Sequence, residues 1–136
     1  MKRPEEKVIR ELVDQWLHKA DQDMEAAAAL LTDQVTLPYP SCFHSQQAAE
    51  KYLKALLTWR QREFPPTHSI RKLLNIIRAS DPSLAEELEE AATLTVYGVQ
   101  ARYPGNLPDP DVNNARQALR LARRVREAVL RILPSS

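Results

Sequence analysis

Apolar residues recur every three or four positions through most of the chain, which is the period of a helix that buries one face. This pattern predicts a helix over residues 5–31, a second over 41–62 and a short third over 70–79. It predicts two further long helices, over residues 82–102 and from about 109 or 111 to 133. The apolar stripe of the first helix consists of Val8, Ile9, Leu12, Trp16, Ala20, Met24, Ala27 and Leu31.

Proline residues mark the boundaries of these predicted helices, because proline inside a helix loses a hydrogen bond and restricts the residue before it. Pro38 and Pro40 therefore predict that the second helix starts only at Ser41, whose hydroxyl is a suitable N-cap. Asp81 followed by Pro82 is a start signal for the predicted helix over residues 82–102. Short connections force consecutive helices to run antiparallel. The predicted fold class is therefore all-α, an up-and-down bundle of four long helices plus one short helix.

Length and composition predict a single globular domain spanning residues 1–136. Of the 136 residues, 43% are apolar and 27% are charged, and the net charge is +1. This near-neutral balance argues against a surface built entirely for nucleic acid, although a local basic face is compatible with it. No apolar run approaches the roughly 18 residues of a membrane span, and the first residues lack a secretion signal. We therefore expect a cytoplasmic protein with no membrane partner.

The second predicted helix carries an unusual set of polar residues on one strip. At about 100° per residue, His44, Gln47, Lys51 and Lys54 lie on one side, with Glu50 beside them. Lysine and glutamine side chains bind phosphates or base edges, and histidine binds a phosphate or transfers a proton. The same groups are equally suited to hydrogen bonds with neighbouring helices or to a subunit contact. The pattern leaves a binding site and an ordered structural strip as alternatives.

Histidine and cysteine residues give no sign of a metal centre. His68 follows Pro65-Pro66 at the start of the short helix, where it is suited to capping amides or reaching into the bundle end. A metal site would have to combine His44 and His68 with a carboxylate such as Glu50, and their spacing matches no metal motif. Cys42 is the single cysteine and is expected to be buried. We predict no metal and no cofactor.

Arginine residues near the end of the chain are further candidates. Arg102 and Tyr103 end the fourth predicted helix, where they are suited either to binding a phosphate and stacking on a base or to capping the helix. The last helix is a candidate nucleic-acid face or a partner for the acidic start of the helix over 82–102. A solvated charged face is the commoner outcome and the one we favour. The arginines of the last predicted helix are Arg116, Arg120, Arg123, Arg124, Arg126 and Arg131.

Three blocks of sequence resemble the HEPN domain family (higher eukaryotes and prokaryotes nucleotide-binding). Residues 43–51 read Phe-His-Ser-Gln-Gln-Ala-Ala-Glu-Lys and resemble its signature; residues 67–70 and 101–104 resemble two further blocks, in the same order. The resemblance implies a bundle of four or five helices that is usually a homodimer. Prokaryotic members are often encoded beside a small nucleotidyltransferase, and many such pairs act as toxin and antitoxin.

The resemblance also bears on catalysis, because many HEPN toxins are metal-independent ribonucleases. Their motif is an arginine followed, after four to six residues, by a histidine near the start of the last long helix. Here Arg102 is followed at the matching positions by Leu107, Pro108 and Asp109, so the histidine is missing. Arg62 and His68 have a suitable spacing, but they flank the Pro65-Pro66 turn in another part of the fold, and we regard that match as coincidence.

The leading prediction is a homodimeric HEPN module that binds a nucleotide, RNA or a partner protein and works with a small nucleotidyltransferase. One alternative is a ribonuclease toxin that uses Arg102 with a non-standard base such as His44. The other is a purely structural interaction protein. The predicted ligand contacts are His44, Gln47, Lys51, His68, Arg102 and Tyr103.

Overall fold

Helices make up most of the structure, and the described residues form no β-strand beyond one isolated bridge between Leu31 and Thr36. The computed structural model describes the backbone of residues 4–102 and 108–134, and the side chains of these residues except 4 and 99–102. The elements are α1 (Pro4–Ala29), α2 (Pro38–Trp59), α3 (Ile70–Ser80), α4 (Pro82–Glu87), the 3₁₀ helix η1 (Glu89–Leu94), α5 (Thr95–Arg102) and α6 (Val112–Ile132). The predicted all-α bundle is confirmed.

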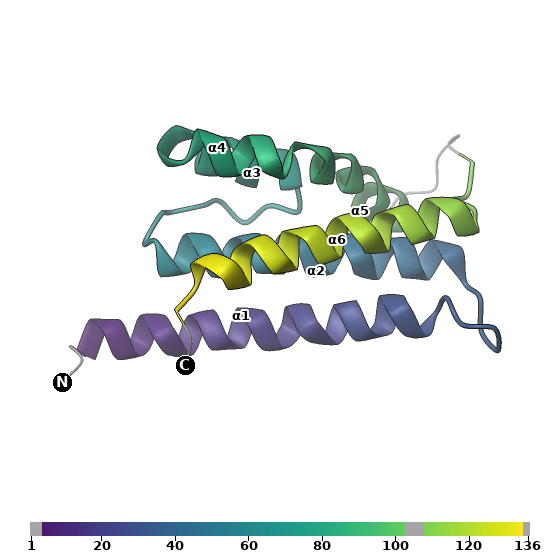
Figure 1. The fold of residues 1–136 in the computed structure, drawn as a ribbon, viewed down its shortest axis with the longest axis horizontal. Helices are drawn as coiled ribbons and strands as arrows, with labels where there is room; N and C mark the ends of the chain where they lie inside the picture. Colours follow the sequence, from purple (N-terminus) through teal and green to yellow (C-terminus); the bar gives the residue numbers. More distant parts are fainter. Residues whose placement is uncertain (1–3, 103–107, 135–136) are drawn as a thin grey trace.

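Helix α2 lies at the centre of this bundle (Figure 1). Helix α1 runs antiparallel to it on one side, α6 packs along it in the same direction as α2, and the row formed by α3, α4, η1 and α5 lies on the side away from α1. Most α2 residues are buried as a result, including the fully buried Tyr52, Leu53 and Leu56. A polar strip on this helix therefore faces neighbouring helices over much of its length.

The start of α2 differs from the prediction, because the helix begins at Pro38 and Ser41 lies inside it. Amide groups in the first turn of a helix have no acceptor within the helix, so Pro38 and Pro40 lose no bond there. The Ser41 hydroxyl instead donates to the carbonyl of Ala27 at 2.8 Å and ties α2 to α1. The helix also ends earlier than predicted, at Trp59, because the chain turns at Gln61 with a φ of 55°.

The predicted helix over residues 82–102 is divided into α4, η1 and α5. Its middle section has the tighter 3₁₀ pitch, in which residues three positions apart lie on the same face. That pitch places Leu88, Ala91 and Leu94 on one side, and all three are buried. The apolar spacing of three thus matches a 3₁₀ helix better than a continuous α-helix.

Side-chain caps mark the starts of three helices, and the one at Asp81 was predicted. The Ser69 hydroxyl accepts a bond from the Lys72 amide at the start of α3, and Asp81 caps α4 through the Leu84 amide. Asp111 and Asn114 form a reciprocal capping box at the start of α6.

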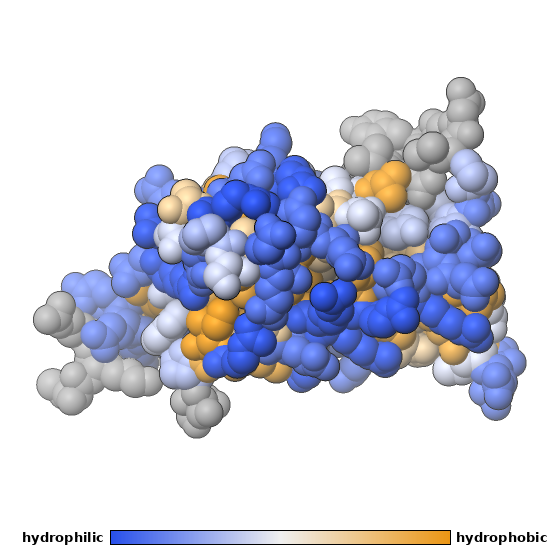
Figure 2. All heavy atoms as spheres, turned by 45° about the horizontal axis from the view of Figure 1, so that its top comes forward, coloured by the Kyte–Doolittle hydropathy of each residue, from blue (hydrophilic) through white to orange (hydrophobic). Residues whose placement is uncertain are grey.

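The outer surface is mostly hydrophilic on the face that Figure 2 shows, and the apolar areas there are small and separate. None of the described helices is long and apolar enough to cross a lipid bilayer.

Candidate functional site

The polar strip of α2 divides into two clusters, the first of which joins α2 to α1. Asp23 of α1 accepts from His44 Nδ1 at 2.9 Å with one carboxylate oxygen. Its other oxygen accepts from Lys51 Nζ at 2.5 Å. We call these three residues the Asp23 cluster. Because one carboxylate binds two donors that lie two helical turns apart on α2, the cluster holds the two helices in register.

The second cluster, which we call the Glu50 network, consists of Gln46, Gln47, Glu50, Lys54 and His68. The Glu50 side chain is only 3% exposed and accepts three bonds. Its Oε1 accepts from Gln46 Nε2 at 3.1 Å and from His68 Nδ1 at 3.1 Å, and its Oε2 accepts from Lys54 Nζ at 2.8 Å. Gln47 Nε2 donates to Gln46 Oε1 at 2.6 Å. The network therefore satisfies its own hydrogen bonds.

The Lys54 ammonium of this network lies between aromatic rings as well as beside a carboxylate. Its Nζ is 5.4 Å from the centre of the Trp16 ring and 6.0 Å from that of Phe64. A buried charge is costly unless it is paired and hydrogen-bonded, and ring faces add a favourable electrostatic contact. Lys54 is therefore a packed core residue whose charge is balanced by Glu50.

His68 is the member of the Glu50 network that reaches the surface, with 56% of its side chain exposed. An ionised carboxylate can only accept, so the ring nitrogen Nδ1 that faces Glu50 carries a proton, and in the neutral form of the ring Nε2 is then an acceptor. The main chain is held as well, because Gln46 Nε2 donates to the His68 carbonyl at 3.0 Å. The structure thus brings His68 to Gln47 and Glu50, whereas the sequence placed His68 in a separate motif from these two residues.

Gly98 explains how closely α5 approaches this network. A Cβ atom at this position would lie 3.0 Å from Gln46 Oε1. Glycine within a helix costs about 1 kcal/mol relative to alanine, and here its missing side chain permits a close crossing of α5 over α2.

Two of the predicted contacts fall at the edge of the described residues. Arg102 is the last residue of α5, and its side chain is outside the described part. Tyr103 lies outside the described residues altogether. Cys42 is buried, as predicted, and burial raises the pKa of its thiol to about 11.

The arginines of α6 fall into two groups. The first group pairs with acidic residues of other helices. Arg126 Nε lies 3.3 Å from Asp21, Arg131 lies 2.9 Å from Glu87, and Arg124 lies 3.8 Å from Glu90.

The other group consists of Arg116, Arg120 and Arg123, which are exposed. None of them forms an ion pair with a residue in the described part of the chain. We call these three residues the arginine strip.

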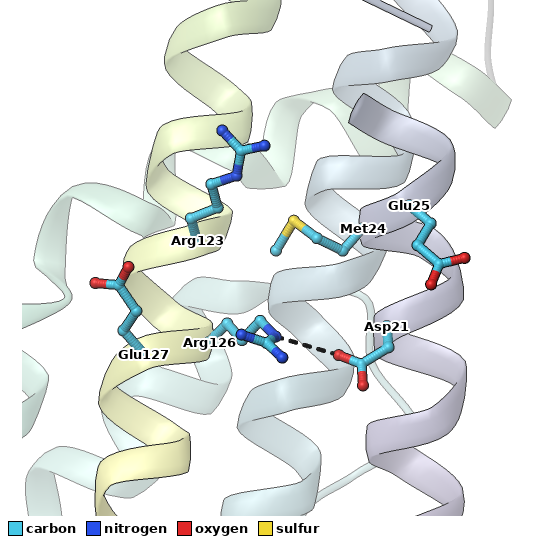
Figure 3. Close-up of a pocket in the computed structure, with 6 residues that line it drawn as sticks. All are labelled: Asp21, Met24, Glu25, Arg123, Arg126 and Glu127. Atoms are coloured by element: carbon cyan, nitrogen blue, oxygen red, sulfur yellow. Dashed lines mark hydrogen bonds and ion pairs between the residues drawn. The ribbon is translucent and has the colours of Figure 1, made fainter. Parts of the chain in front are cut away.

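A groove of about 400 Å³ lies beside the arginine strip, between α1 and α6. Its lining comprises Asp21, Met24, Glu25, Arg123, Arg126 and Glu127. In Figure 3 the side chains of Met24 and Arg123 point into the space between the two helices, and Arg126 points to Asp21. The carboxylates of Glu25 and Glu127 point away from it.

Three helices meet at the floor of this groove. The buried Tyr52 hydroxyl of α2 and Arg126 Nε both donate to Asp21 Oδ1. Burial, followed by the bond to Asp21, raises the pKa of Tyr52. Sequence reasoning did not identify Asp21 as a candidate, and it considered Arg126 only as one arginine of the last helix. Asp21 and Arg126 are 105 positions apart, so no local pattern joins them.

Comparisons with known proteins agree with this fold. The family model described as HEPN domain matches residues 13–133. The crystal structure of TT1696 from Thermus thermophilus is 30% identical in sequence, with a TM-score of 0.73, and the alignment covers 89% of this chain and 98% of that chain. ST0689, an archaeal HEPN homologue, is 25% identical with a TM-score of 0.68, and the alignment covers 96% and 97%. No curated protein matches this chain.

Proposed function

Because the chain belongs to the HEPN domain family, we propose that it is an RNA-binding module that holds a phosphate backbone on the arginine strip of α6. The observation that supports this proposal is the set of three exposed guanidinium groups on one face of α6, which have no ion-pair partner among the described residues. Arg116 and Arg123 are separated by about 10 Å along the helix, because each residue rises about 1.5 Å. Residues 112–126 hold five arginines and no acidic residue. This local excess of positive charge contrasts with the net charge of +1 for the whole chain.

The residues around the strip favour nucleic acid over a protein partner. Asn113 and Asn114 are exposed beside it, and amide and guanidinium groups are common donors to phosphate oxygens. Protein interfaces need a buried apolar centre. In the first half of α6 no described residue is a large exposed hydrophobic one.

The predicted ligand contacts on α2 are already bonded to other residues of the protein. His44 and Lys51 are bound to Asp23, and Gln47 is bound to Gln46. A ligand would have to break those bonds to reach them, whereas the arginine strip has no such bond to a described acidic residue. The strip is therefore the primary contact in the proposed function.

A second candidate function is metal-independent cleavage of RNA, which one observation favours. The Glu50 carboxylate holds His68 Nδ1 and leaves Nε2 as an acceptor on a half-exposed ring, which is the arrangement of a general base. In this alternative His68, rather than His44, is the non-standard base that acts with Arg102.

The homodimer and the nucleotidyltransferase partner expected from the family resemblance remain part of the proposal. Val8 and Leu12, one turn apart on α1, are 55% and 43% exposed, and a second copy of the chain would cover them. Sedimentation velocity tests this point: replacing both residues with serine should yield monomers. Val35→Ser, at a residue that is 43% exposed outside α1, is the matched control. A wild-type protein that sediments as a monomer would contradict the proposed homodimer.

Binding of a fluorescent single-stranded oligoribonucleotide at several salt concentrations tests the RNA-binding proposal. The triple variant Arg116→Ala, Arg120→Ala, Arg123→Ala removes three phosphate contacts. The plot of log K against log salt should become less steep by about 2, at about 0.7 per contact. Arg131→Ala is the control, because that arginine is already paired with Glu87. Unchanged affinity and slope in the triple variant would exclude the arginine strip.

The same incubations, analysed on a gel in the presence of a chelator, separate binding from cleavage. Intact RNA supports the binding module. Cleavage that is lost in His68→Ala would establish the second candidate function.

A further inference from the structure

The groove between α1 and α6 has polar atoms that no described residue occupies. Asp21 Oδ1 accepts from Tyr52 and from Arg126 Nε, but Asp21 Oδ2 accepts no hydrogen bond from a described residue. Arg126 donates to Asp21 through Nε and also interacts with the Tyr52 hydroxyl. Arg123, at the side of the same groove, has no ion-pair partner among those residues.

The groove is lined by both charged and apolar side chains. It offers two guanidinium groups, one carboxylate oxygen and the apolar, polarisable side chain of Met24. The other two carboxylates of the lining, those of Glu25 and Glu127, point away from it in Figure 3. The lining therefore combines two guanidinium groups with three carboxylates, and Asp21 is the carboxylate that is bonded to Arg126.

The Asp21 carboxylate is held from two sides. Tyr52 comes from α2 and Arg126 from α6, and together they bind one oxygen of an aspartate on α1. With Oδ1 restrained in this way, the direction of Oδ2 is restrained too. A preorganised acceptor binds a matching donor more tightly than a mobile one, because little ordering entropy is lost on binding.

We infer that this groove is a nucleobase subsite that takes a base with an exocyclic amino group, cytosine or adenine. Arg123 binds the phosphate, Met24 packs against the flat face of the base, and Asp21 Oδ2 accepts a hydrogen bond from the amino group. The volume of about 400 Å³ is in the range of small-molecule sites. The inference rests on the proposed RNA-binding function, because Arg123 belongs to both the arginine strip and the groove.

Binding of short oligocytidylate and oligouridylate of equal length tests the subsite. Uracil has a carbonyl where cytosine has its amino group, and a carbonyl repels the Asp21 carboxylate. The wild-type protein should bind oligocytidylate about fivefold more tightly than oligouridylate, the discrimination expected of one good base contact. Equal affinity for the two would overturn the subsite and leave the proposed RNA-binding function intact. Binding of neither would overturn both.

The variant Asp21→Asn tests which atom discriminates. Its amide oxygen can still accept from Tyr52 and Arg126, but an amino group replaces Oδ2, so a donor now faces the base. The preference should shift toward oligouridylate. Asp14→Asn, the same change at an exposed aspartate of α1 outside the groove lining, should keep the wild-type preference. A wild-type preference in Asp21→Asn would overturn the assignment of Asp21.

Competition with small ligands separates a base subsite from a simple phosphate site. Cytidine monophosphate should displace the labelled oligocytidylate at concentrations at which inorganic phosphate does not. Equal displacement by the two would overturn the base subsite, because phosphate alone would then account for binding. The comparison of the two oligonucleotides and the competition experiment use the wild-type protein and do not depend on the stability of a variant.

Discussion

The polar residues of α2 and the arginines at the start of α6 look alike in the sequence, yet the fold treats them in opposite ways. Glu50 is buried with three donors, and Asp23 binds both His44 and Lys51. The arginine strip, in contrast, lies on the outer surface of a flanking helix and has no ion-pair partner among the described residues. The difference arises from position, because α2 is covered by helices along most of its length and α6 is covered on one face only.

This comparison teaches that a conspicuous polar motif is not necessarily the surface that meets a ligand. The motif on α2 makes contacts between helices, and those contacts give the bundle a defined arrangement. The arginine charges of α6 lie elsewhere, on the outer surface. Mutations should therefore have different effects in the two regions. Substitutions in α2 should lower the stability of the fold, and substitutions in the arginine strip should lower the affinity for RNA.

Glu50→Ala should have the largest effect on stability. It leaves the buried Lys54 ammonium without its partner, which typically costs about 3–5 kcal/mol. The free energy of unfolding, measured in urea, checks this value. Glu25→Ala on the exposed side of α1 is the control and should change it by less than about 0.5 kcal/mol. A small change in the free energy of unfolding for Glu50→Ala would contradict the contrast between α2 and α6, because the Glu50 network would then not stabilise the fold.

Gly98→Ala should give the next largest effect. The added Cβ would lie 3.0 Å from Gln46 Oε1, and Gln46 is fully buried and bonded to Gln47, Glu50 and His68. Overpacking a core costs about 1–3 kcal/mol, and the better helix propensity of alanine returns about 1 kcal/mol of that. We expect a net loss of about 1 kcal/mol in urea unfolding. An increase in stability would show that Gln46 moves aside easily.

Much of the fold could be predicted from the sequence because the relevant signals are local. The apolar period located the helices, and Asp81 marked the start of α4. Local rules failed where a residue type is compatible with two structures. Pro38 reads as a helix breaker and also as a first-turn residue, so sequence alone placed the start of α2 too late.

The candidate site was less predictable, because its partners come from distant parts of the chain. The strip on α2 was visible in the sequence, but Asp23 lies 21 positions before His44, and His68 lies 18 positions after Glu50. Only the packing of α1 and of the α2–α3 connection against α2 brings these groups together. Whether a charged side chain is paired depends on such packing. For that reason the sequence could not show that Arg126 is paired with Asp21 while Arg123 has no ion-pair partner among the described residues.

Lys51→Met should produce a smaller loss than either core change. It removes one of the two donors to Asp23 and keeps much of the apolar stem. Because both side chains are partly exposed, solvent screens the pair, and we expect a loss of about 0.5–1 kcal/mol in urea unfolding. RNA binding should stay at the wild-type level. A marked loss of RNA affinity at wild-type stability would instead restore Lys51 as a ligand contact.

Single alanine substitutions in the arginine strip should have the smallest effect on stability and thereby sharpen the comparison. Arg120 is exposed and has no ion-pair partner in the described part of the chain, so Arg120→Ala should change the free energy of unfolding by less than about 0.5 kcal/mol. Its RNA affinity should fall and its salt slope should decrease by about 0.7. The free energy of unfolding and the RNA affinity should be measured for both Arg120→Ala and Glu50→Ala. A loss of affinity in the first variant and a loss of stability in the second would assign binding to α6 and folding to α2. If Arg120→Ala lost stability without losing affinity, the strip would be a structural surface, and the phosphate contact would have to lie elsewhere in the chain.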